Sequence, residues 1–102
     1  MKLKRESLAK KRLPDLYRVL FTPEAGDRLE EIEHDDPKSA RIIFDHIKKL
    51  PQTYSSDPFL KGPSFKGLRR NRMGRYRFIY RVLEQEKEIH IMTIDLRKSI
   101  YD

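Results

Sequence analysis

The segment Tyr76–Leu83 alternates between two kinds of side chain. Because successive side chains of a strand point to opposite faces, this pattern predicts a strand with one face on a core and one outward, arginine-bearing face. The core-facing set is Tyr76, Phe78, Tyr80 and Val82, and the outward set is Arg77, Ile79, Arg81 and Leu83. Such a strand needs helices or a second sheet over its aromatic face, which limits the chain to a layered fold.

Two consecutive helix-initiation signals supply the covering layer. Thr22 and Asp36 can each cap a helix, and each precedes a proline at the first helical position, where a missing N–H costs nothing. The apolar positions that follow recur at helical spacing and predict helices over about 23–34 and 37–50, the second ended by Pro51. So short a connection predicts an antiparallel helical hairpin.

Short apolar segments on both sides of this hairpin predict the remaining strands. The predicted strands cover residues 16–21, 65–72, 76–83 and 88–96. Gly74 is the expected positive-φ residue of the turn between the second and third. The order strand, helix, helix, strand, strand, strand predicts an α+β fold, with the helical hairpin on one face of a mostly antiparallel, curved sheet. Its last three strands form a meander.

The 102 residues suffice for one core, so we expect a single domain over 16–102 preceded by a basic arm over 1–15. No apolar run approaches the roughly 18 residues that cross a bilayer, and we expect no membrane association. The chain contains no cysteine, which excludes disulfides, a thiolate nucleophile and a cysteine-ligated zinc site. The expected location is the cytoplasm.

Positive charge is concentrated in one part of the chain. The net charge is +7, and residues 61–81 contain eight Lys or Arg and no Asp or Glu. Arginine predominates there, and its planar fork suits phosphate better than the compact charge of lysine does. This pattern favours a polyanionic partner over a surface that only aids solubility. The expected RNA-binding residues are Lys66, Arg69, Arg72, Arg75 and Arg81.

Other chemistry has little support in the sequence. His34, His46 and His90 lack metal-like spacing, and each is interpreted as an ordinary surface or sheet residue. The chain has no phosphate-cradling glycine-rich loop and no recognisable nucleophile motif. We therefore expect neither a metal nor a cofactor.

The remaining candidate is the arginine-bearing face together with the end of the chain. Arg70 and Arg77 lie on neighbouring predicted strands, and Arg97 and Tyr101 follow the last strand at an i, i+4 spacing. If that end folds over the sheet, these groups could bind a phosphate and stabilise a pentacovalent transition state. RNA brings its own nucleophile, the 2′-OH. The alternative is that Tyr101 packs and the arginines only bind backbone phosphates.

These residues resemble the RelE/ParE superfamily of bacterial and archaeal toxins. The shared pieces are Gly67-Leu68-Arg69-Arg70, the Gly-x-Tyr-Arg-φ-φ-Tyr segment Gly74–Tyr80, the apolar strand over 89–94, and Arg97 followed by Tyr101. The resemblance covers about residues 16–102 and implies a RelE/ParE-like fold. It also implies a small toxin that is neutralised by a cognate antitoxin protein.

The resemblance implies two activities. RelE-like members cut mRNA in the ribosomal A site, using the 2′-OH to leave a 2′,3′-cyclic phosphate and a 5′-hydroxyl, whereas ParE-like members inhibit DNA gyrase. For the first activity, Arg77 corresponds to the arginine that holds the scissile phosphate and Tyr101 to the tyrosine that orients the 2′-OH. Arg70 takes a basic position of the active-site strand, and Arg97 is a candidate charge stabiliser or proton donor.

The expected function is therefore that of a toxin acting as a metal-independent, ribosome-dependent mRNA endonuclease, with the ribosome, mRNA and an antitoxin as partners. Two positions depart from the nuclease pattern: Leu68 replaces a typical basic residue, and Ile100 stands where some members have a catalytic histidine. These departures leave the general acid open. They favour the alternatives, a ParE-like gyrase inhibitor or a catalytically degraded RNA-binding member of the fold.

Overall fold

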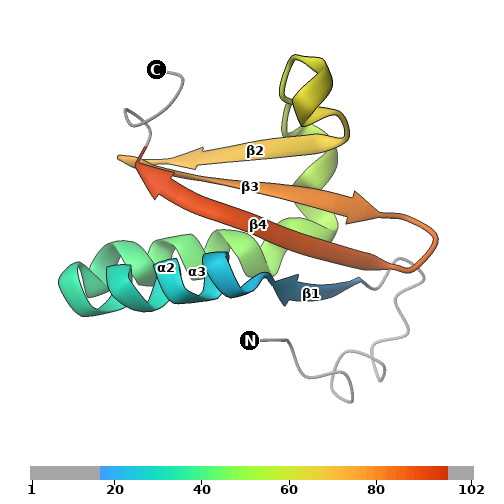
Figure 1. Cartoon of the computed structure of the whole chain (residues 1–102). Coiled ribbons are helices and arrows are strands. Elements are labelled where there is room, and N and C mark those ends of the chain that lie inside the picture. The colour runs from blue at the N-terminus through green and yellow to red at the C-terminus, as the bar shows by residue number, and fades with distance from the viewer. Residues whose placement is uncertain (1–16, 97–102) are drawn as a thin grey trace, which may run out of the picture.

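Figure 1 shows the computed structural model of the chain, which describes residues 17–96. The described elements are β1 (Arg18–Phe21), α2 (Pro23–Asp35), α3 (Pro37–Thr53), the 3₁₀ turns η1 (Tyr54–Ser56) and η2 (Pro63–Phe65), β2 (Leu68–Met73), β3 (Tyr76–Leu83) and β4 (Glu88–Leu96). This order confirms the predicted α+β class. The expected basic arm over 1–15, and the candidates Arg97 and Tyr101, lie outside the described residues.

The four strands form one open sheet in the order β1-β4-β3-β2, with the two helices together on one side of it (Figure 1). Strands β2, β3 and β4 form the predicted antiparallel meander. Strand β1 runs parallel to β4 but pairs only with its first half, Glu88 to Ile91. The later half of β4 therefore lies beside α2 rather than beside β1.

The predicted caps hold both helices in place. The Thr22 hydroxyl accepts a hydrogen bond from the Ala25 N–H (3.1 Å) and donates one to the Met92 carbonyl (2.9 Å), which ties the start of α2 to β4. The Asp36 carboxylate caps α3 by accepting from the Ser39 N–H (3.3 Å) and from its hydroxyl (2.7 Å). These bonds from Ser39 are the main reason why the pKa of Asp36 is lowered.

The prediction that Pro51 ends the second helix is wrong, because α3 continues to Thr53. Proline lacks the N–H that would bond to the carbonyl four residues earlier, but the residues that follow it keep their own donors. The Tyr54 N–H bonds to the Leu50 carbonyl, and the Thr53 hydroxyl donates to the Lys49 carbonyl at 3.2 Å. These two bonds carry the helix past the proline.

The core lies between the helices and the sheet, as the apolar stripes predict. Its buried members come from α2 (Ala25, Leu29, Ile32), α3 (Ala40, Ile43, Ile47, Leu50), β3 (Tyr76, Phe78, Tyr80) and β4 (Ile89, Ile91, Ile94), joined by Tyr17, Val19 and Met73. Phe44 and Val82 are partly buried against this cluster. Neither described helix is long and apolar enough to cross a membrane.

Adjacent isoleucines of α3 allow a test of this packing. Ile43 is completely buried, whereas Ile42 is 45% exposed. We expect Ile43→Ala to lower the free energy of unfolding by about 2 to 5 kcal/mol, since it removes buried methyl groups and leaves a cavity. Ile42→Ala should change it by less than about 0.5 kcal/mol. Urea denaturation of both variants measures the difference, and equal losses would contradict the orientation of α3.

Candidate nucleic-acid interface

The arginines of β2 and β3 gather mainly on the sheet face opposite the helices. Strand alternation places Arg70 and Arg72 of β2 on this face together with Arg77 and Arg81 of β3. The register sets Arg72 directly beside Arg77, while Arg70 pairs with Ile79. We call the four residues Arg70, Arg72, Arg77 and Arg81 the arginine face. The structure therefore brings together four of the nine site residues expected from the sequence.

Arg77 differs from its neighbours in accessibility. The sequence predicts an outward side chain, and Arg77 does lie on the face away from the helices, but only 1% of it is exposed. The prediction of a solvent-facing side chain is thus wrong for Arg77, and also for Ile79, which is 6% exposed. Arg72 and Arg81 are exposed, as predicted. A buried guanidinium interacts with nearby charges more strongly than a solvated one, because the surrounding dielectric is lower.

A group of paired charges closes one end of this face. His90, opposite Arg81 in the register, is hydrogen-bonded through Nε2 to Glu88 Oε1 at 2.9 Å, and Arg18 of β1 also binds Glu88. The hydrogen bond with His90, followed by that from Arg18, lowers the pKa of Glu88. His90 is therefore a sheet residue that pairs with a carboxylate, in line with its interpretation from the sequence.

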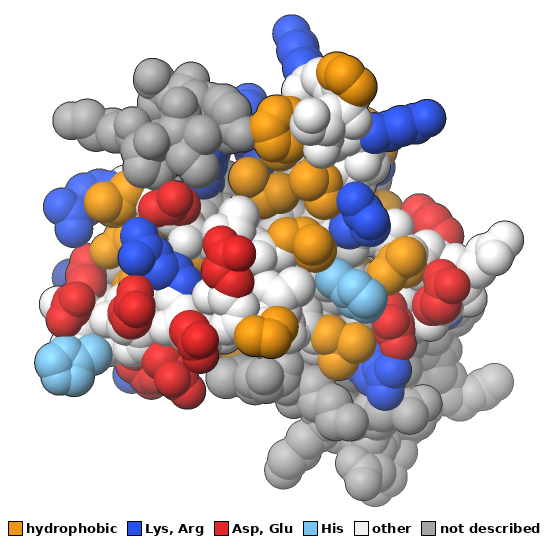
Figure 2. All heavy atoms as spheres, in the orientation of Figure 1, with side chains coloured by type: hydrophobic (Ala, Val, Ile, Leu, Met, Phe, Trp, Pro, Cys, Tyr) orange, Lys and Arg blue, Asp and Glu red, His pale blue; other side chains and the backbone are white. Residues whose placement is uncertain are grey.

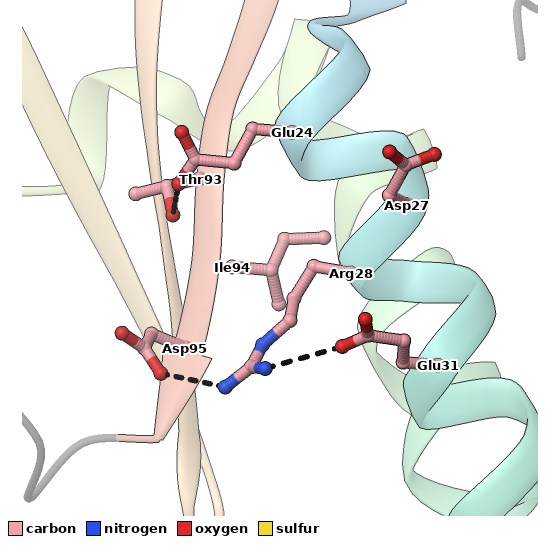
Figure 3. Close-up of a pocket in the computed structure, with 7 residues that line it drawn as sticks. All are labelled: Glu24, Asp27, Arg28, Glu31, Thr93, Ile94 and Asp95. Carbon is pink, nitrogen blue, oxygen red and sulfur yellow. Dashed lines mark hydrogen bonds and ion pairs between the residues drawn. The ribbon is translucent and has the colours of Figure 1, made fainter.

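A pocket of about 400 Å³ lies between α2 and the later half of β4 (Figure 3). Arg28 extends across it, donating from Nη2 to Asp95 (3.0 Å) and from Nη1 to Glu31 (3.2 Å). The other residues that line it are Glu24, Asp27, Thr93 and Ile94. Because four of the seven lining residues are carboxylates, this pocket repels phosphate and is not a continuation of the arginine face.

The surface charge of α2 agrees with this division. Figure 2 shows acidic side chains gathered over α2, at the lower left of the view. The acidic residues of this helix are Glu24, Asp27, Glu30, Glu31, Glu33 and Asp35. In the same view, Lys and Arg side chains stand out at the upper right, and a few lie among or beside these acidic side chains. A polyanion is therefore favoured at the β2 side of the molecule and disfavoured at α2.

Three expected RNA-binding residues lie away from the arginine face. Arg69 points to the opposite side of β2, where its Nη1 donates to the Asp57 carbonyl at 2.7 Å. Arg75 lies in the β2–β3 turn, with Nη2 3.7 Å from an oxygen of Asp36, and Lys66 is exposed in the loop before β2. The sequence prediction grouped these three with the others because it used their positive charge and did not consider which face of the sheet each side chain occupies.

Asp57 anchors the loop that precedes β2, and sequence reasoning missed this role. Its carboxylate accepts hydrogen bonds from the Tyr80 hydroxyl (2.5 Å) and from the Asn71 side-chain amide (3.0 and 3.1 Å). Burial and then this bond to Asp57 raise the pKa of the Tyr80 phenol. Within residues 17–96, no three His, Asp or Glu side chains lie close enough together to hold a metal ion.

A double-mutant cycle tests the anchor. Asp57→Ala leaves the buried Tyr80 hydroxyl and the Asn71 amide without their main acceptor, so we expect the free energy of unfolding to fall by about 1 to 3 kcal/mol. Adding Tyr80→Phe removes the orphaned hydroxyl and should recover part of that loss. Asp45→Ala, at an exposed position of α3, is the control. Strictly additive effects in urea denaturation would show that Asp57 and Tyr80 do not interact.

Comparisons with known proteins match most of the chain. Residues 19–101 match a family model described as the ParE toxin of the type II toxin–antitoxin system parDE. No curated protein sequence matches. A chain of the RelBE2 toxin–antitoxin complex from Mycobacterium tuberculosis is 23% identical, with a TM-score of 0.70 over 80% of this chain and 99% of that one.

Two further solved structures share the fold. The YoeB/ParE toxin from Agrobacterium tumefaciens is 21% identical, with a TM-score of 0.67 over 78% of this chain and 96% of that one. A chain of the archaeal RelE–RelB complex from Pyrococcus horikoshii is 25% identical, with a TM-score of 0.62 over 81% of this chain and 97% of that one. These similarities confirm the predicted RelE/ParE-like fold.

Proposed function

This chain belongs to the ParE toxin family of type II toxin–antitoxin systems, and from the arginines on one face of its sheet we propose that it cleaves mRNA on the ribosome without a metal. It is a toxin of the RelE/ParE superfamily, whose members share its fold. The observation that carries the proposal is the arginine face, where four guanidinium groups lie on adjacent strands of one sheet surface. Guanidinium groups bind phosphate in bidentate fashion, which suits a ribose–phosphate backbone.

Two acids of β4 near the arginine face have cationic partners of their own. Glu88 is bound by Arg18 and His90, and Asp95 is bound by Arg28 of α2. Within residues 17–96, these two carboxylates of β4 therefore each have a cationic partner from outside the arginine face. The net positive potential supports binding of an RNA backbone, and such binding weakens as salt rises.

In the proposed reaction, the 2′-oxygen attacks the adjacent phosphorus while the bond from phosphorus to the 5′-oxygen breaks. The 2′-OH proton is lost and the leaving 5′-oxygen gains one, giving a 2′,3′-cyclic phosphate and a 5′-hydroxyl. Tyr101 would orient the 2′-OH, and Arg97 would stabilise charge or donate a proton; both are outside the described residues. RNA supplies the nucleophile, so the protein needs only to position the 2′-OH beside the phosphate and to stabilise the transition state.

Arg77 takes the central role in this proposal. Arg77 is 1% exposed, and its backbone pairs with Arg72 of β2 on one side and Asp95 of β4 on the other. A fixed charge in a low-dielectric setting stabilises developing negative charge on a phosphate more than a solvated one does. Binding of RNA would have to make Arg77 accessible to the scissile phosphate.

We further propose that a cognate antitoxin covers the arginine face with an acidic segment that folds on binding. Two relatives with this fold are described as toxin–antitoxin complexes, RelBE2 and archaeal RelE–RelB. The arginine face is positive, so an acidic, partly disordered segment of the antitoxin would be complementary to it. The toxin would act in the cytoplasm, where mRNA is translated. Coexpression with the neighbouring gene product should relieve growth arrest, and its failure to do so would count against this pairing.

A second candidate function is inhibition of DNA gyrase, as in ParE-like toxins. The match to a ParE model and the burial of Arg77 favour it. Induction of the protein without antitoxin separates the two. New mRNA 5′ ends on ribosomes would support the endonuclease. Loss of supercoiling with double-strand breaks, and no new mRNA ends, would support gyrase inhibition instead.

Single-turnover cleavage of programmed ribosomes tests the assigned roles. Arg77→Ala should lower the cleavage rate by about 10²–10³, since it removes a donor that stabilises the transition state, while ribosome binding changes little. Arg81→Ala, the matched control on the same strand, should weaken binding and reduce its salt dependence but keep the rate at saturation. An unchanged rate in Arg77→Ala would place the chemistry elsewhere.

The same assay tests the role of Tyr101 and the prediction that cleavage needs no metal. Tyr101→Phe keeps the ring but removes the hydroxyl, so cleavage should slow while binding stays near that of the unaltered protein. A chelator selective for transition metals, with the Mg²⁺ that the ribosomes need left in place, should leave the rate unchanged. Inhibition by the chelator that added metal reverses would contradict the proposed mechanism.

A further inference from the structure

Three side chains at the β2 edge of the sheet form a stacked group on the side away from the arginine face. The guanidinium carbon of Arg69 lies 3.9 Å from the centre of the Phe59 ring and 5.6 Å from the centre of the Tyr54 ring. Arg69 thus joins two aromatic rings through cation–π contacts. We call Tyr54, Phe59 and Arg69 the aromatic platform.

Backbone pairing holds this platform rigidly. The segment around Phe59 forms an antiparallel bridge with Arg69, supported by bonds from Leu60 N–H to the Leu68 carbonyl (2.8 Å) and from Arg70 N–H to the Pro58 carbonyl (3.1 Å). The Arg69 side chain is fixed further by its bond to the Asp57 carbonyl. A ligand that stacks on such a ring would pay little entropy for ordering it.

The Phe59 side chain is unusually exposed for a large hydrophobic residue. It is 56% exposed, more than Ile42 or Leu96, the other exposed large hydrophobic residues among those that the structure describes. One side of its ring rests on a guanidinium, and over half of its surface faces solvent. The ring therefore contributes little to the core and offers an open aromatic surface.

The segment that carries this ring is rich in positive charge. Residues 58–75 contain no Asp or Glu and include Lys61, Lys66 and four arginines. Two acids outside this segment lie near the platform: Asp57 accepts hydrogen bonds from Tyr80 and Asn71, and Glu84 accepts one from the Tyr54 hydroxyl at 3.2 Å. An exposed aromatic ring within a cationic, acid-free segment is the arrangement by which proteins bind single-stranded nucleic acid, with bases stacked on rings and phosphates on cations.

We propose that Phe59 is a base-stacking platform for single-stranded RNA, and that the RNA passes around the β2 edge from the arginine face. Arg69 and Arg70 are neighbours on β2 and point to opposite faces, so a strand that crosses this edge meets cations on both sides. This inference rests on the proposed function in taking RNA as the ligand. An acidic antitoxin peptide would share the charge but has no regular succession of bases to stack.

Binding of a cleavage-resistant RNA tests the platform separately from catalysis. A 2′-O-methyl oligonucleotide of about ten nucleotides, within the usual footprint of such proteins, has no 2′-OH to react. By fluorescence anisotropy, Phe59→Ala should bind it roughly 10-fold more weakly, because one base loses its stacking partner. Phe59→Trp should bind like the unaltered protein, whereas Phe59→Leu should resemble Phe59→Ala.

Three further measurements distinguish base stacking from charge and from a general effect of trimming an exposed side chain. Ile42→Ala, which trims an exposed side chain on α3, should leave RNA affinity unchanged. The salt dependence of Phe59→Ala should match that of the unaltered protein, because no phosphate contact is removed. A 2-aminopurine base in the oligonucleotide should be quenched by the unaltered protein and less so by Phe59→Ala.

The outcomes separate this inference from the proposed function. RNA affinity of Phe59→Ala within twofold of the unaltered protein would overturn the platform. So would a loss of antitoxin binding with RNA binding intact, which would make Phe59 a protein contact. Weakened RNA binding by Phe59→Ala, with no cleavage of ribosomal mRNA by the unaltered protein, would support the platform and contradict the endonuclease.

Discussion

Burial of the aromatic face of β3 against the two helices is the constraint on which the rest of the structure depends. Phe78 and Tyr80 are completely buried, and Tyr76 nearly so. Because strand side chains alternate, the residues between them must lie on the other face, and that is where Arg77 and Arg81 stand. A slip of one residue in the register would turn the arginines under the helices, which makes this register strongly preferred. The arginine face is thus a direct consequence of how the core forms.

A second dependency links the core to the outermost part of the sheet. Asp57 receives the hydroxyl of Tyr80, a core residue, and its backbone carbonyl receives the guanidinium of Arg69, an edge residue. The loop between α3 and β2 is therefore held from two sides, and the bridge that places Phe59 beside Arg69 follows from it. A loop restrained in this way can present a side chain in a defined orientation although it has no regular structure of its own.

The parts of the fold that depend on nearby residues could be predicted from the sequence. The caps at Thr22 and Asp36 and the alternation of β3 are local signals, and the structure confirms them. The parallel pairing of β1 with β4 could not be predicted, because the paired residues are 70 positions apart in the sequence. Arg18 and Glu88 are one such pair, and their side chains are also bonded. The burial of Arg77 and the turning of Arg69 toward Asp57 also depend on packing that no local pattern encodes.

The distribution of charge limits how a polyanion can approach. The acidic side chains of α2 lie beside the later half of β4, and Arg28 there is already engaged by Asp95 and Glu31 (Figures 2 and 3). The helix side therefore repels phosphate, whereas β2 and the loop before it attract phosphate on both surfaces of the sheet. This uneven distribution of charge orients an approaching polyanion before any specific contact forms. A strand of RNA is drawn to the β2 edge, where Arg70 lies on one surface and Arg69 with Phe59 on the other.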